Sequence, residues 1–115
     1  MKIVVDKEMT VSQLGRAFNE VYPFLKIELY CKGNEVSNDS FNTLGEIANV
    51  KKPSIFIISP TMTIHEIETY FWEELGLQVA VFRKVGNSWI HTSFTNDWTL
   101  ERQNRTGMNI FGAIA

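Results

Sequence analysis

The sequence of 115 residues has little cysteine, little proline and no apolar run long enough to cross a membrane. Its one thiol, Cys31, excludes an internal disulfide and any zinc site built from several thiolates. Its charge is close to balanced, with 11 basic and 13 acidic residues, so no overall positive field attracts nucleic acid or an anionic membrane. Asp6 and Glu8 stand where a secretory signal would be apolar. We therefore predict a soluble cytoplasmic protein that binds neither nucleic acid nor membrane.

Catalytic and cofactor motifs are also missing from the sequence. It contains none of the short patterns that hold a phosphate, a dinucleotide, a catalytic zinc or a serine nucleophile. Of the two histidines, His65 falls in a helical first turn and His91 on a strand, and neither has a recognisable catalytic partner. A general base made of His91 with Asp97 is the one catalytic arrangement left open. The prediction is a protein that is not an enzyme and that needs neither metal nor cofactor.

What the sequence does contain is an internal repeat. Adding 53 to the residue number places residues 9–14, MTVSQL, over residues 62–67, MTIHEI. The match continues at later positions: Phe18 with Phe71, Gly33 with Gly86 and, at an offset of 56, Thr43-Leu44 with Thr99-Leu100. Units of this size are too small to fold alone, so two of them are expected to share one core. We predict a single domain, residues 1–115, made of two related halves, about 1–53 and 54–115.

Each half is predicted to form one amphipathic helix. Apolar residues recur at helical spacing from Val11 to Val21 and from Ile64 to Leu75. Both segments begin with the capping-box pattern, Thr10 with Gln13 and Thr63 with Glu66. Pro23 and Gly76 then end the two helices at matching positions.

Strands are predicted on both sides of each helix. Ile3–Val5 and Ile55–Ile58 are apolar without alternation, which is typical of strands that are buried on both faces or lie at the centre of a sheet. Lys26–Tyr30 and Gln78–Arg83 alternate, as half-exposed edge strands do. With right-handed crossovers, these elements predict a ferredoxin-like α+β fold. In that fold, one four-stranded antiparallel sheet in the spatial order 78–83, 3–5, 55–58, 26–30 carries both helices on one face.

A C-terminal β extension is expected to follow this unit. Gly86-Asn87 predicts a hairpin turn, and Ser88–Phe94 predicts a further strand. Met108–Phe111 is expected to add an edge strand or to cover apolar surface.

An alternative fold comes from a resemblance that covers about half of the chain. The run from Thr63 to Leu77, then Val79–Phe82, Gly86 and Asp97–Leu100, resembles the second part of ubiquitin-like β-grasp domains. A β-grasp domain begins with a β-hairpin, whereas a single strand precedes each helix here. The resemblance implies a protein-binding role by analogy, and it transfers no functional residue.

The expected function lies on the sheet face opposite the helices. Tyr30, Ala80 and Phe82 should point away from the helices and, with Val4 and either Phe56 or Ile58, form a broad apolar surface that needs a cover. We predict a protein-interaction or assembly module that self-associates through this open face. The alternative is a regulatory domain that binds a small molecule in a pocket near the second-half hairpin. Candidate binding residues are Tyr30, Phe82, Arg83, Trp89, His91 and Trp98.

Overall fold

The computed structural model describes residues 2–114, and of residues 111–114 it describes only the backbone. The chain is α+β, with antiparallel sheets, as predicted. Its elements in chain order are β1 (Ile3–Asp6), α1 (Val11–Val21), β2 (Leu25–Cys31), β3 (Asn34–Val36), α2 (Leu44–Ala48), β4 (Ile55–Ile58), α3 (Ile64–Leu75), β5 (Gln78–Val85), β6 (Ser88–His91), the short 3-10 helix η1 (Ser93–Thr95) and α4 (Leu100–Ile114).

The strands form two sheets instead of the one that the sequence predicts. β1 pairs with β4 as an antiparallel ribbon, and the other sheet has the order β3-β2-β5-β6. The ferredoxin-like order is therefore wrong, because β2 and β5, expected at opposite edges, pair directly, with Ile27 opposite Val81. Alternating polarity tells which face of a strand is buried but not which strand lies beside it. Direct pairing of β2 with β5 brings their apolar rows to one inner face.

The β1–β4 ribbon turns only one face to the core. Along β1, Ile3 and Val5 are buried whereas Val4 is 50% exposed, and β4 shows the same alternation. The outer face of the ribbon consists of Val4 and Ile57, which lie opposite one another, and Ile55. The expectation that these strands are buried on both faces is wrong. Every residue of the run is apolar, so the sequence does not show that alternate side chains remain in contact with solvent.

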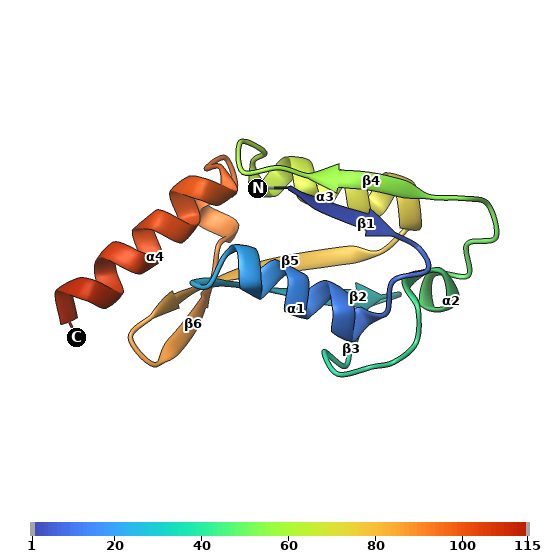
Figure 1. The fold of residues 1–115 in the computed structure, drawn as a ribbon, viewed down its shortest axis with the longest axis horizontal. Coiled ribbons are helices and arrows are strands. Elements are labelled where there is room, and N and C mark those ends of the chain that lie inside the picture. Colours follow the sequence, from blue (N-terminus) through green and yellow to red (C-terminus); the bar gives the residue numbers. More distant parts are fainter. Residues whose placement is uncertain (1, 115) are drawn as a thin grey trace.

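Helices α1 and α3 close the two sides of the space between the ribbon and the larger sheet (Figure 1). α1 contacts β1 and β2, and α3 contacts β4 and β5. Both predicted apolar stripes face this core, and their central residues, Phe18 and Phe71, are fully buried. The capping boxes at Thr10 and Thr63 are both formed.

The helix starts in each half also cap one another. The amide of Val11 at the start of α1 donates to the carbonyl of Asn42, and the amide of Leu44 at the start of α2 donates to the carbonyl of Met9. The start of α3 and the start of α4 exchange the corresponding bonds, from Ile64 to Trp98 and from Leu100 to Met62. Donors and acceptors correspond at the offsets of 53 and 56 that relate the two halves of the sequence. Backbone groups that helix ends leave without intrahelical partners are satisfied in this way.

The C-terminal segment is a helix where an edge strand was one expectation. β6 forms as predicted but ends at His91, and residues 108–111 belong to α4. α4 packs against β5 and β2 and extends away from the two sheets (Figure 1). Its contact with β5 includes Arg83, which lies in the same inward row as Val81, so α4 does not cover the outer sheet face. The side chain of Phe111 lies outside the part that the structure describes.

Candidate functional site

Four of the six predicted site residues share the outer face of the larger sheet. The register places Phe82 beside Lys26 on β2 and beside His91 on β6, and the aromatic rings of Phe82 and His91 meet edge to face at 5.2 Å. Tyr30 and Trp89 follow the same alternation on this face. Burial and then the charge of Glu28 raise the pKa of Tyr30, whose hydroxyl donates to Glu28 at 3.4 Å.

This outer face is a mixture of aromatic and basic side chains and is not broadly apolar. Lys26 Nζ lies 5.2 Å from the ring centroid of Phe82 and 5.3 Å from that of Trp89. Lys84 Nζ lies 5.5 Å from the ring centroid of Trp89. The predicted continuation through Val4, Phe56 or Ile58 is wrong, because these residues belong to the separate ribbon and the last two point into the core.

Arg83 and Trp98 lie apart from the other predicted site residues. Arg83 Nη1 donates to Gln103 Oε1 at 2.7 Å, and burial lowers the pKa of Arg83. The Trp98 ring has Arg83 at 5.5 Å and Arg102 at 3.8 Å from its centroid. Both predicted residues therefore attach α4 to the inner side of β5, and they contribute nothing to the outer face.

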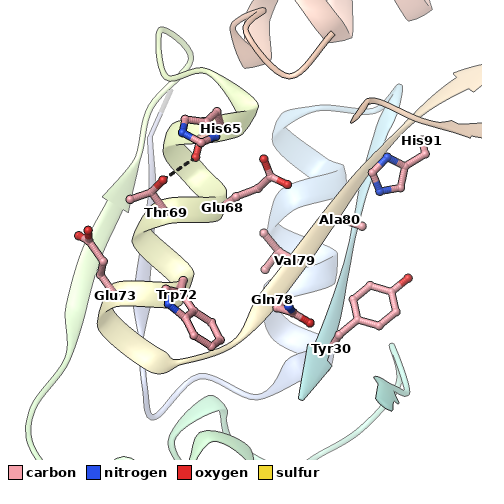
Figure 2. A pocket seen from close by; sticks show the side chains of 10 residues that line it. All are labelled: Tyr30, His65, Glu68, Thr69, Trp72, Glu73, Gln78, Val79, Ala80 and His91. Carbon is pink, nitrogen blue, oxygen red and sulfur yellow. Dashed lines mark hydrogen bonds between the residues drawn. The ribbon is translucent and has the colours of Figure 1, made fainter. Parts of the chain in front are cut away.

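A groove of about 600 Å³ runs between α3 and β5 and continues over β5 onto the outer sheet face (Figure 2). Trp72 stands in its wall with 59% of its surface exposed, and Glu68 points from α3 toward β5. The remaining lining residues are Tyr30, His65, Thr69, Glu73, Gln78, Val79, Ala80 and His91. The sequence identified Tyr30 and His91 among them and missed those on α3. The sequence feature that could have pointed to α3 is Trp72, a large aromatic residue that lies off the apolar stripe of its helix.

β5 has an open edge along this groove. β2 pairs with β5 from Gln78 to Arg83, but β6 pairs only with Phe82–Val85. Within the described residues, no strand covers the other side of residues 78–81. Thr92 donates from its amide and its hydroxyl to the carbonyl of Val81, which places the backbone groups of Val81 on this side. Because backbone direction alternates along a strand, the N–H and C=O of Val79 point to the same open edge.

In the first half, a side chain uses one backbone acceptor of the corresponding edge. A smaller hollow of about 330 Å³ lies between α1 and β2. There, Asn19 Nδ2 donates to the carbonyl of Leu25 at 3.0 Å and so uses a backbone acceptor of β2. Trp72 stands 53 residues after Asn19 and has no amide to donate in this way. The two halves therefore differ in the side chain at this position, an amide that uses a backbone acceptor of β2 in the first half and an aromatic ring in the second.

Other chemistry at the site is limited. His91 Nδ1 accepts the amide N–H of Ser93 at 3.0 Å, so that nitrogen is engaged in a local turn. Among residues 2–114, no group of three or more His, Cys, Asp or Glu side chains is placed to hold a metal ion. Over the same residues, no helix is both long enough and apolar enough to cross a membrane.

Comparison with known proteins gives no relative. No protein-family model matches the chain, and neither the curated proteins nor the solved structures include a significant match. The groove and the open edge of β5 are therefore interpreted from their own geometry.

Proposed function

We propose that the protein is a non-enzymatic interaction module that binds an extended segment of a partner protein along the open edge of β5. The open edge is the single observation that carries this proposal. An incoming strand would pair with the N–H and C=O of Val79, which point into the groove. Such an edge is one that proteins normally protect, as Asn19 does at Leu25 in the first half.

The walls of the groove suit a peptide chain. α3 runs along one side and supplies Trp72, an aromatic side chain of the kind that anchors protein interfaces. Val79 and Ala80 form an apolar floor beneath it. Backbone pairing would supply affinity, and the side chains of α3 would supply specificity. A second copy of this chain is one source of such a segment, which keeps self-association within the proposal.

The test uses a capped hexapeptide of sequence TQTITT and the 15N-labelled full chain. Titration to millimolar peptide is expected to shift the amide signals of Gln78–Val81 in NMR spectra. The same peptide with an N-methyl group on every backbone amide has no N–H to donate from either edge and is expected to cause no shift. Equal binding by the two peptides, or shifts confined to other parts of the chain, would overturn the proposal.

A variant of α3 gives the second half the asparagine that the first half has at the matching position. Trp72→Asn removes the aromatic wall of the groove, and its new amide is expected to donate to the carbonyl of Leu77, which shares the edge with Val79, so peptide binding should be weakened while thermal unfolding stays cooperative. The matched control is Trp89→Asn, which removes an exposed aromatic from the outer sheet face and should leave binding unchanged. Undiminished binding by Trp72→Asn would show that the groove is not the site.

The second candidate is a small-molecule site in the same groove. Its volume of about 600 Å³ falls in the usual range of ligand pockets, about 300–1,000 Å³. Of the pocket expected near the second-half hairpin, His91 lines the groove, whereas Arg83 and Trp89 do not. A metabolite panel in a thermal-shift assay tests this candidate, since a specific ligand raises the unfolding temperature. Stabilisation that persists in Trp72→Asn would place the ligand elsewhere.

We also propose that the two halves arose as repeats of one strand–helix–hairpin–helix unit. The matching exchange of bonds between helix starts supports this proposal. A variant pair, Thr43→Ala and Thr99→Ala, tests whether the two positions are structurally equivalent: both should destabilise the chain by about 1 kcal/mol, since each threonine caps a helix.

A further inference from the structure

We infer that the partner segment carries a lysine or arginine and, two residues away, a large apolar side chain. This inference rests on the proposed function and adds the chemistry of the segment that the groove selects. The observations that carry it are the charges of the groove and the spacing of Glu68 and Trp72 on α3.

The groove is acidic and its acidic groups lack basic partners. Its lining includes Glu68 and Glu73 but neither lysine nor arginine. Within the described residues, neither carboxylate forms an ion pair. Of the basic side chains on the outer face, Lys26 pairs with Glu28 and lies over Trp89, and Lys84 also lies over Trp89. A basic side chain of a partner would therefore meet an uncompensated carboxylate, and an acidic one would be repelled.

Glu68 is the carboxylate placed to select this charge. It points from α3 toward β5, whereas Glu73 points away from β5 at the rim (Figure 2). A strand added beside β5 would direct every second side chain toward α3, because side chains alternate along a strand. The side chains on that side would face Glu68 and Trp72.

The spacing of these two residues fits the repeat of a strand. Residues four apart on a helix are separated by about 6 Å along its axis. Residues two apart on a strand are separated by about 6.6–6.8 Å. One side chain of the segment can thus lie at Glu68 while the next on the same side lies at Trp72, which gives the pattern of a basic residue and an apolar residue with one residue between them.

The test compares three peptides that differ at one position. TKTITT, TQTITT and TETITT present lysine, glutamine or glutamate two residues before isoleucine, and each is titrated by NMR into the labelled full chain at low salt. We expect TKTITT to bind about 2- to 5-fold more tightly than TQTITT, the range for one partly exposed ion pair, and TETITT to bind more weakly than both. Added salt should reduce these differences.

Glu68→Gln should abolish the preference for lysine over glutamine at the second position of the peptide. The matched control, Glu20→Gln, removes the same charge from the exposed surface of α1 and should keep the preference. Equal binding of all three peptides at Gln78–Val81 would overturn the inference while the proposed function stands. Loss of the preference in Glu20→Gln as well would also overturn it, because the net charge would then explain it. If none of the peptides shifts these amides, both proposals fail.

Discussion

Replacing Gly107 by alanine tests how closely α4 packs against the end of the larger sheet. A Cβ atom at this position would lie 2.8 Å from the Cβ of Phe24 and 3.2 Å from the Cγ of Arg83. Carbon atoms in contact normally stay about 3.5–4.0 Å apart, so the helix or the strand end has to shift. Overpacking of this kind costs about 1–3 kcal/mol, whereas alanine in place of glycine favours a helix by at most about 1 kcal/mol. We expect Gly107→Ala to lower the free energy of unfolding by about 1 kcal/mol.

Gly15 in α1 provides the matched control. A Cβ there meets no atom within 4 Å, and the residue lies inside a helix. Gly15→Ala should therefore raise the free energy of unfolding by about 0.5–1 kcal/mol, through the preference of the helix for alanine alone. Identical substitutions in two helices are thus expected to have opposite effects.

Urea unfolding of the two variants measures both effects. The midpoints should move in opposite directions with little change in the m-value. Hydrogen exchange should show that Gly107→Ala reduces protection mainly in α4. If Gly107→Ala stabilises the chain as much as Gly15→Ala does, the close contact of α4 with Phe24 is refuted.

Three further predictions concern buried or capping groups. Burial raises the pKa of Tyr22 to about 12, so the unfolded chain loses the phenolic proton near pH 10 while the folded chain keeps it; stability should fall between pH 10 and 12, and urea unfolding of Tyr22→Phe should show a smaller fall. Hydrogen bonds from Thr43 lower the pKa of the Glu46 carboxyl. The stability that ionised Glu46 adds to the folded chain is therefore present above the pKa that Glu46 has in the unfolded chain, and it is lost as the pH falls. Below pH 5, the free energy of unfolding of Glu46→Gln should therefore decrease less steeply with falling pH than that of the wild type. An unchanged pH dependence would contradict the capping role. Gln103→Leu should cost about 1–3 kcal/mol in thermal unfolding, because it leaves half-buried Arg83 without its acceptor; a neutral effect would show that Arg83 finds water instead.

The sequence predicted the local structure of the fold well. Capping boxes at Thr10 and Thr63 and the apolar stripes of α1 and α3 depend on residues a few positions apart, and all of them formed. The reciprocal capping of helix starts follows the same matched positions, but it joins segments about 30 residues apart and could not be derived from spacing alone.

Strand pairing was predicted less well because it is a long-range choice. The apolar rows of β2 and β5 are compatible with two arrangements, in which the strands are opposite edges of one sheet or direct neighbours. The sequence does not show which arrangement is more stable. β1 and β4 pair with one another, as was expected of the two central strands. Val4 on the outer face is half exposed, however, so an unbroken apolar run did not mean burial on both faces.

The candidate site was predicted in part for a related reason. Alternation along β2 and β5 placed Tyr30 and Phe82 on one face, and alternation along β6 placed Trp89 and His91 on one side of that strand; the register brings the four together, which alternation alone does not predict. The open edge of β5 depends on where β6 stops pairing, which follows from the turn of the backbone at Thr92 into η1. Since no short motif marks that turn, Glu68 and Trp72 could not be connected with β5 from the sequence.

The central claim is that the open edge of β5 accepts an added strand. It is tested most directly by isotope-filtered NOE spectra of the labelled chain with TKTITT, combined with hydrogen exchange of the Val79 amide. We expect cross-strand NOEs between the peptide backbone and residues 78–81, and slower exchange of the Val79 amide when peptide is bound. NOEs that instead connect the peptide with Trp89 and Lys84, with exchange at Val79 unchanged, would contradict the claim.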